Sequence, residues 1–208
     1  MTGKNRIDTV VFDIGNVLAD FNWDSCIHNI FSDENIIARV NEAMRGYGLW
    51  EEFDRGVMTD DEIISAFISH APDVEREIRL ACRHIGNCIS RMDHSIPWIR
   101  EVKAAGRRAL YLSNYSRIIM KTNPGVLDFL PLMDGGIFSC DVHLLKPDRA
   151  IYDRLCREYS LTPSSCVFID DVKENVEAAR NFGLHAIQCL SPRQARADLQ
   201  ALLEPERP

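Results

Sequence analysis

The sequence predicts an α/β fold, with a Rossmann-like parallel sheet, helices on both faces and an inserted all-helical cap. Short apolar runs at 9–12, 109–112 and 166–169 each stop abruptly at polar residues, as buried strands do. After Pro97, such runs alternate with segments of helical spacing. This alternation is typical of a parallel sheet that is covered on both faces.

The core elements are expected in chain order. Residues 9–12 form a strand that leads Asp13 into a tight turn at 14–16. The segment 98–103 has helical spacing, and Gly106 suits the position just beyond the end of a helix. The remaining expected elements are strands at 109–112, 136–139, 166–169 and 186–189, a helix opened by Pro147, and a helix at 172–182 stopped by Gly183.

Residues 19–94 differ from the remainder of the chain, because they show helical spacing without β-rich runs. Thr59 and Glu62 fit a capping box that opens one of these helices. The aromatic residues Trp50 and Phe53 are interpreted as the core of a helical bundle, with substrate contact as the alternative. The predicted division is an α/β core of residues 1–18 and 95–208 and a helical cap of residues 19–94.

Composition and charge narrow the functional classes. The chain has 208 residues, of which 46% are hydrophobic and 26% charged, so it can bury a full core. Its net charge of −7 argues against nucleic acid or an anionic membrane as a partner, because both need a basic surface. The charge leaves room for a small anionic substrate held by a metal ion and a lysine.

The cysteines and the amino terminus predict a cytoplasmic protein. Seven cysteines, an odd number without a C-x-x-C pair, are expected to be reduced thiols rather than a disulfide framework. Lys4 and Arg6 are followed by Asp8 and Asp13, which interrupt any apolar leader segment. No stretch approaches the ~18 apolar residues of a membrane span.

Polar residues at the ends of the predicted strands indicate a site. Asp13, Ser113 and the pair Asp170-Asp171 each follow an apolar run, and ligands of parallel α/β sheets lie at the carboxyl ends of the strands. Two adjacent carboxylates repel each other unless a cation compensates them, and oxygen ligands favour Mg²⁺. With Lys146, this set suits phosphoryl transfer, with Asp13 as the nucleophile.

These residues resemble the four ordered motifs of the haloacid dehalogenase-like (HAD) hydrolase superfamily. The resemblance covers nearly the whole chain, because residues 19–94 lie where that family inserts a helical cap. Residues 15–18 are most similar to the branch that contains bacterial sugar-phosphate phosphatases, including the α-D-glucose-1-phosphate phosphatase type. The four motifs are Asp13-Ile14-Gly15-Asn16-Val17, Leu112-Ser113-Asn114, Lys146-Pro147-Asp148 and Ile169-Asp170-Asp171 with Asn175.

The resemblance implies a role for each matching residue. Asp13 would attack phosphorus and form an aspartyl-phosphate. Asp13, the backbone carbonyl of Gly15 and the side chain of Asp170 would bind Mg²⁺. Asp171 would act through a metal-bound water, and Asn175 would steady the loop that carries these carboxylates.

The resemblance also implies a phosphate site and one missing group. Ser113 and Asn114, beside Gly15, would hold the transferring phosphoryl group, and Lys146 would neutralise it. Most phosphatases of the superfamily have an aspartate where this chain has Gly15, and that aspartate serves as general acid and base. A general acid contributes on the order of 10² to 10⁴ in rate, so its loss is serious without being fatal.

Three further residues near the motifs have open interpretations. His143 stands where relatives often have glycine and Leu145 where they often have arginine, and both could reshape the substrate mouth. His143 is either a ligand contact or a loop residue. Arg117 either reaches the distal part of the substrate or is a solvated helix arginine.

The leading interpretation is a Mg²⁺-dependent phosphatase that acts on a small phosphorylated metabolite, with a sugar phosphate as one candidate. The alternative from another class is a non-catalytic or weakly active HAD-like protein that binds phosphate or a protein partner. A haloacid dehalogenase is less favoured, because it would not need the Asp170-Asp171 pair. A monomer or a homodimer is expected.

Overall fold

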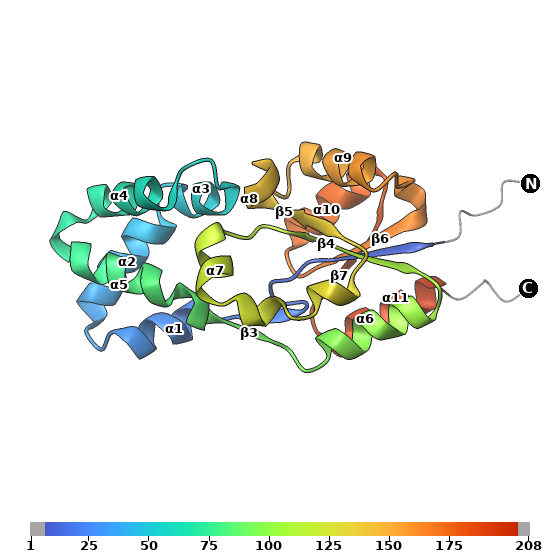
Figure 1. Cartoon of the computed structure of the whole chain (residues 1–208), viewed down its shortest axis with the longest axis horizontal. Helices are drawn as coiled ribbons and strands as arrows, with labels where there is room; N and C mark the ends of the chain where they lie inside the picture. The colour runs from blue at the N-terminus through green and yellow to red at the C-terminus, as the bar shows by residue number, and fades with distance from the viewer. Residues whose placement is uncertain (1–6, 204–208) are drawn as a thin grey trace, which may run out of the picture.

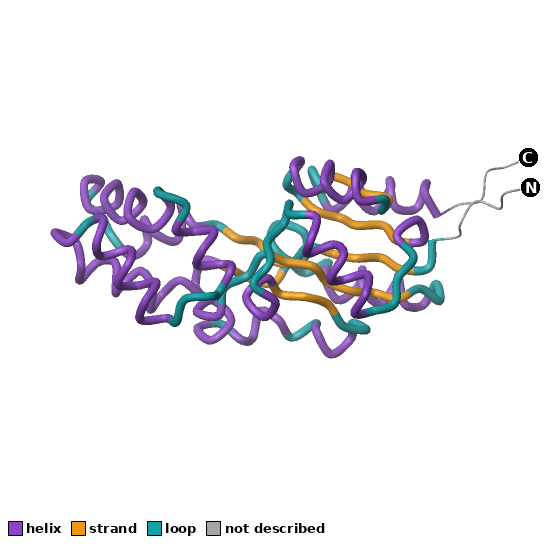
Figure 2. The backbone as a smooth tube through the Cα atoms, turned by 90° about the horizontal axis from the view of Figure 1, so that it is seen from above, coloured by secondary structure: helices purple, strands orange, loops and turns teal. Residues whose placement is uncertain are grey.

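The computed structural model describes residues 7–203 of the chain. Lys4 and Arg6, considered above as part of a leader, lie outside the described residues. Five parallel strands form the central sheet, and Figures 1 and 2 show them side by side at one end of the molecule. In spatial order they are β5 (Gly136–Phe138), β4 (Arg108–Ser113), β1 (Thr9–Phe12), β6 (Cys166–Asp170) and β7 (His185–Gln188). The predicted parallel α/β fold is confirmed.

Helices cover both faces of this sheet (Figure 1). The alternation within β1 separates two clusters, because Val10 and Phe12 pack with Trp98 on one face and Val11 packs with Tyr152 on the other. The first face carries α6 (Ser95–Ala104) and α11 (Pro192–Leu203), and the second carries α9 (Arg149–Glu158) and α10 (Lys173–Phe182). Helix α11 was not anticipated from the sequence.

The remaining elements of the sheet end are short. Helix α7 (Arg117–Thr122) follows β4, and α8 (Ser139–Val142) follows β5. Gly106 and Gly183 both adopt a positive φ just beyond α6 and α10, where each helix was expected to stop. Single turns of 3₁₀-helix connect other segments: η1 (Pro72–Val74), η2 (Ile85–Cys88), η3 (Pro124–Leu127), η4 (Leu130–Leu132) and η5 (Pro163–Ser165).

Residues 23–88, called the helical region below, form a bundle at the other end of the molecule (Figure 1). The expected capping box is present, because the Thr59 hydroxyl accepts from the Glu62 backbone and the Glu62 carboxylate accepts from the Thr59 backbone. The helices are α1 (Trp23–Ile30), α2 (Glu34–Arg45), α3 (Leu49–Arg55), α4 (Asp60–His70) and α5 (Glu75–His84). The bundle is not joined to the sheet by helices alone. Strands β2 (Ala19–Phe21) and β3 (Ile89–Arg91) pair antiparallel at its base.

The expectation that all cysteines are reduced is wrong for one pair. Cys26 on α1 and Cys88 in η2 form a disulfide, with 5.0 Å between their Cα atoms. The two residues are 62 positions apart, so no local spacing could reveal that α1 folds back beside η2. The other five cysteines are free and buried, in agreement with the expectation: Cys82, Cys140, Cys156, Cys166 and Cys189.

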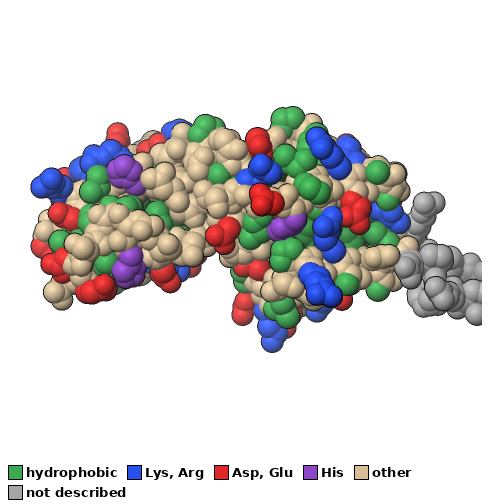
Figure 3. Space-filling view, turned by 90° about the horizontal axis from the view of Figure 1, so that it is seen from below, with side chains coloured by type: hydrophobic (Ala, Val, Ile, Leu, Met, Phe, Trp, Pro, Cys, Tyr) green, Lys and Arg blue, Asp and Glu red, His purple; other side chains and the backbone are tan. Residues whose placement is uncertain are grey.

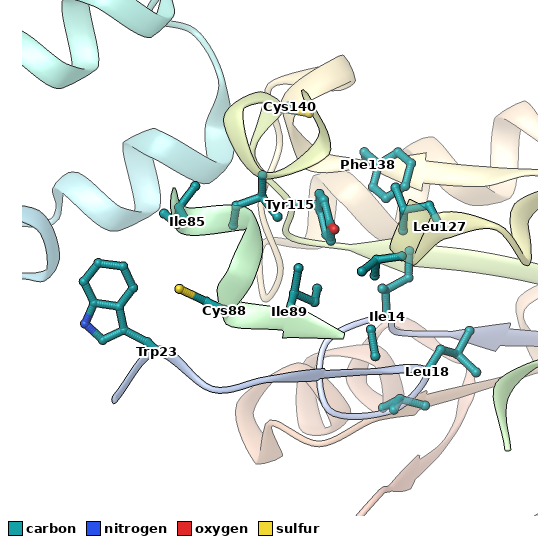
Figure 4. Packing of buried hydrophobic residues seen from close by; sticks show 14 of the residues in the cluster. Ile14, Leu18, Trp23, Ile85, Cys88, Ile89, Tyr115, Leu127, Phe138 and Cys140 are labelled. Carbon is teal, nitrogen blue, oxygen red and sulfur yellow. The ribbon is translucent and has the colours of Figure 1, made fainter. Parts of the chain in front are cut away.

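The helical region and the sheet end share a continuous hydrophobic core. In Figure 4, Tyr115 lies between Ile85 at the base of the helical region and Phe138 at the end of β5, with Ile89 below it, and all four belong to one buried cluster. On the face seen in Figure 3, acidic and basic side chains are interspersed over both ends of the molecule. Among residues 7–203, no helix is both long and apolar enough to cross a bilayer.

Candidate active site

The strand ends bring the predicted charged residues into contact. Asp13 directly follows β1, Asp170 ends β6, and Lys146 lies in the loop between α8 and α9. The Lys146 Nζ lies 2.8 Å from Asp13 Oδ1 and 2.7 Å from Asp170 Oδ2. All three residues are buried, and Asp170 is fully inaccessible to solvent. One ammonium group therefore bridges two carboxylates at the edge of the sheet.

Burial dominates the protonation of these groups. It raises the pKa of Asp13, an effect that the Lys146 ammonium opposes and the Asp170 carboxylate reinforces. Burial alone would lower the pKa of Lys146, but Asp13 and Asp170 outweigh it and raise that pKa. Burial also raises the pKa of Asp171, although Asn16 Nδ2 donates a 2.9 Å hydrogen bond to its carboxylate. The site is therefore short of positive charge.

The acidic residues form a suitable set of ligands for a metal ion. Asp13, Asp170 and Asp171 each offer a carboxylate oxygen, and these atoms lie within 4.8 Å of one another. Three carboxylates against one lysine leave a formal charge of −2 that a divalent cation would balance. Oxygen-only ligands beside an open cavity are those that Mg²⁺ prefers. The residues present therefore fit this ion.

Neighbouring side chains hold the charged groups in place. Asn175 Nδ2 donates to both carboxylate oxygens of Asp170, each at 3.1 Å. The Asn114 amide brackets the backbone of Lys146, donating to its carbonyl at 3.0 Å and accepting from its N–H at 2.9 Å. The Ser113 hydroxyl lies close enough to the Asp13 carboxylate to lower its pKa. The Asn114 side chain is thus engaged with Lys146 rather than free toward a phosphoryl group.

A cavity of about 190 Å³ opens onto these residues and extends toward the helical region. Its two ends differ in character. Asp13, Ser113 and Lys146 lie at the sheet edge, whereas Trp50 and Asp54 come from α3. The other residues that line the cavity are Gly15, Asn16, Phe21, Ile89, Asn114, Tyr115, Ile119, Asp171, Val172 and Asn175.

The two aromatic residues of α3 have different environments. Trp50 packs against Phe21 and Trp23, with ring centroids 6.1 and 5.4 Å apart, and also lines the cavity. Phe53 is buried against Phe67 in the bundle and does not line this cavity. The bundle-core interpretation therefore describes Phe53, whereas Trp50 combines core packing with access to the cavity.

The residues with open interpretations lie away from the cavity lining. The Arg117 guanidinium donates to the carbonyls of Gly56 and Cys140, so it is neither a solvated arginine nor part of the cavity wall. His143 Nδ1 lies 3.1 Å from the Arg55 carbonyl oxygen. Arg117 and His143 thus join the sheet end to the end of α3. Leu145 is buried.

Sequence reasoning did not identify several residues of the cavity. Asp54 follows Glu51 and Glu52 in an acidic helix, and no local pattern separates a cavity residue from solvated neighbours there. Tyr115 is buried, and its hydroxyl has no hydrogen-bond partner in the described part of the chain. Asn16 was already part of the first motif, and the structure adds that it lies in the left-handed region (φ 54°), which is uncommon for a non-glycine residue.

Comparisons with known proteins agree with this geometry. A family model described as haloacid dehalogenase-like hydrolase matches residues 7–183. The chain belongs to this family. In Bacteroides thetaiotaomicron, a HAD family enzyme crystallised with magnesium and inorganic phosphate superposes with a TM-score of 0.71 at 16% identity, over 88% of this chain and 93% of that one.

Two curated relatives of similar length are named as phosphatases. Sesquiterpene phosphatase astK of Aspergillus oryzae is 25% identical, covering 84% of this chain and 85% of that protein. Phosphatase MT3486 of Mycobacterium tuberculosis is 26% identical, covering 86% of each. The HAD chain also matches longer proteins: it spans 34% of drimenol cyclase drtB of Aspergillus calidoustus and 20% of acyl-CoA dehydrogenase family member 10 of Mus musculus, at 25% identity to each. Together with the family match, the phosphatase relatives support a hydrolase of the phosphatase kind.

Proposed function

We propose that the protein is a Mg²⁺-dependent phosphatase that hydrolyses a small phosphorylated metabolite through an aspartyl-phosphate at Asp13. One observation carries this proposal. The Asp13 carboxylate lies at the end of the cavity, in contact with Lys146 and Ser113 and beside two further carboxylates. A carboxylate nucleophile, a fixed ammonium and a metal-binding set are the parts that phosphoryl transfer needs.

The residues of the chain divide the chemistry among them. An oxygen of Asp13 attacks phosphorus, while the Lys146 ammonium and the Ser113 hydroxyl stabilise charge on the phosphoryl oxygens. The Asn114 side chain holds the backbone of Lys146, so Asn114 acts on the phosphoryl group by positioning Lys146. Asp13, the Gly15 carbonyl and Asp170 would hold Mg²⁺, with Asp171 acting through water and Asn175 orienting Asp170. The bound ion would supply the positive charge that the carboxylates lack.

The helical segment of residues 19–94 is proposed to act as a cap that selects the organic part of the substrate. Phe21, Trp50 and Ile89 of this segment form an apolar wall of the cavity together with Ile119 of α7. Such a wall accepts either the apolar face of a sugar ring or a hydrocarbon chain. The resemblance to sugar-phosphate phosphatases supports the first, and a relative named as a sesquiterpene phosphatase supports the second.

The decisive experiment measures phosphate release from a panel of sugar phosphates and short prenyl phosphates, with and without Mg²⁺. We expect release that depends on Mg²⁺ and disappears in Asp13→Asn. The panel also decides between the two substrate classes. If phosphate or its esters bind without turnover, the protein is a phosphate-binding member of the family instead.

A further inference from the structure

Besides Asp13 and Asp171, a third acidic residue lines the cavity, and the chemistry described above does not use it. Asp54, in the last turn of α3, lines the same cavity as Asp13, Gly15 and Lys146. Its carboxylate makes no hydrogen bond or ion pair with any residue in the range 7–203. An acidic group left without a partner inside a cavity is available to a ligand.

The sheet end holds this residue in position through its backbone. Ser139 Oγ donates a 2.6 Å hydrogen bond to the Asp54 carbonyl and accepts a 2.9 Å hydrogen bond from the Tyr115 N–H. His143 lies within hydrogen-bonding distance of the Arg55 carbonyl, and Arg117 donates a hydrogen bond to the Gly56 carbonyl. Asp54 is therefore fixed to the catalytic end of the molecule, although it belongs to the helical region.

The end of α3, just after Asp54, lies so close to α8 that its backbone has little room to move. Gly56 has a φ of 65°, and a Cβ placed on it would lie 2.7 Å from Cys140 Cβ. Only glycine allows the end of α3 to lie this close to α8. Gly15 is different, because a Cβ placed there would meet nothing within 4 Å and its φ lies outside the left-handed region. The position of the missing general acid is thus open space within the cavity.

We propose that Asp54 is the general acid and base of the reaction and replaces, from the helical region, the aspartate that is missing at position 15. This proposal rests on the proposed phosphatase function. Tyr115 also lines the cavity, but its hydroxyl oxygen is buried and has no hydrogen-bond partner within residues 7–203.

In the proposed reaction, Asp54 gives up one proton during phosphoryl transfer to Asp13 and regains one during hydrolysis of the aspartyl-phosphate. First, an Asp13 oxygen bonds to phosphorus as the bond between phosphorus and the ester oxygen breaks. The electron pair of that bond goes to the ester oxygen, which takes the proton of Asp54 and leaves as an alcohol. Next, the Asp54 carboxylate takes a proton from water as the water oxygen bonds to phosphorus. The bond from phosphorus to Asp13 breaks, inorganic phosphate leaves, and both residues return to their starting forms.

The surroundings of Asp54 keep its proton available near neutral pH. Burial raises the pKa of Asp54 to about 7; the Lys146 ammonium opposes the rise, and the carboxylates of Glu51 and Asp13 add to it. The other titratable groups that face it are Asp171 across the cavity, Tyr115 and Cys140. Burial raises the pKa of the Tyr115 hydroxyl, so tyrosine is the poorer acid of the two. An acid works best when its pKa lies near the working pH.

The test compares two leaving groups in Asp54→Asn. An alkyl phosphate must leave with a proton, whereas nitrophenolate leaves without one. We expect kcat for the alkyl phosphate to fall on the order of 10²- to 10⁴-fold and kcat for nitrophenyl phosphate to change by less than about 5-fold. Asp61→Asn, which removes an exposed carboxylate from the first turn of α4, is the control and should leave both rates unchanged.

Two further measurements separate catalysis from structural damage. Gly15→Asp in the Asp54→Asn background should restore turnover of the alkyl phosphate, because the cavity has room for that side chain. The loss of alkyl phosphate turnover above about pH 7 should disappear in Asp54→Asn. Equal losses for both leaving groups, or no loss, would overturn the role of Asp54 while leaving the phosphatase intact. Absence of any phosphate release by the unmodified protein would overturn the proposed function itself.

Discussion

The sheet end and the helical region contribute different things to one cavity. At the sheet edge, every charged group has partners: Lys146 bridges Asp13 and Asp170, and Asn175 holds Asp170. The helical region contributes the ring of Trp50 and the carboxylate of Asp54, which has no hydrogen-bond or ion-pair partner among the described residues. The difference suggests that the sheet edge performs the transfer itself, whereas the helical region acts on the group that departs. Each prediction below tests this division.

The largest effect is expected at the nucleophile. Asp13→Asn keeps the shape of the side chain but cannot form an acyl phosphate, so turnover should fall by several orders of magnitude for every substrate. Circular dichroism should show an unchanged fold. Trapping with a fluoride mimic of phosphate should give a metal-dependent adduct at Asp13 only in the unmodified protein. Activity of Asp13→Asn at the wild-type level would refute the assignment.

The two carboxylates at the end of β6 should differ in their effect on Mg²⁺. Asp170 is buried at the strand end and held by Asn175, whereas Asp171 is only partly buried and bonded to Asn16. Loss of a residue that acts indirectly on a metal typically costs ~10- to 100-fold in affinity or activity. Asp170→Asn should therefore raise the Mg²⁺ concentration for half activity more than Asp171→Asn does. A titration with the reverse order would contradict this.

Removal of the Cys26–Cys88 disulfide tests how much this crosslink between α1 and η2 contributes to the stability of the helical region. Cys26→Ser should lower the free energy of unfolding by about 2–4 kcal/mol, because the crosslink restricts a long loop of the unfolded chain. Denaturant unfolding with and without a reducing agent measures the effect. Cys82→Ser, at a free buried cysteine of α5, keeps the Cys26–Cys88 disulfide and should still lose stability on reduction, whereas Cys26→Ser should not respond to the reducing agent. The rate for nitrophenyl phosphate per folded molecule should be unchanged in Cys26→Ser, since the transfer site lies at the sheet edge.

The smallest expected effect concerns selectivity. Trp50→Leu keeps an apolar wall but changes its shape, so ratios of kcat/KM among phosphate esters should change by about 10-fold. Phe53→Leu, three residues further along α3 and outside the cavity lining, is the matched control. It should lower stability without changing those ratios. A uniform loss across all substrates in Trp50→Leu would mean that Trp50 serves only the bundle core.

Local patterns in the sequence were enough to predict most of the fold. The apolar runs became β1, β4 and β6, and the glycine expected after α10 adopts the left-handed conformation there. The capping box before α4 formed as expected. These predictions succeed because strand alternation, helix capping and glycine conformations depend on residues that are close in sequence. The pairing of β2 with β3, about 70 residues apart, left no such local signal.

By itself, the sequence determined that Asp13, Ser113 and Asp170 gather at one edge, because the carboxyl ends of parallel strands meet there. Only the tertiary structure decided which residues of the helical region lie across the cavity from these three side chains. The Cys26–Cys88 disulfide and the placement of Asp54 both depend on contacts between segments that are distant along the chain. In the sequence, Asp54 is one of several carboxylates in an acidic helix. In the structure, Ser139 and Arg117 hold the end of α3 against the sheet end and so place Asp54 at the cavity. Such contacts arise from the packing of whole elements, which no short stretch of residues encodes.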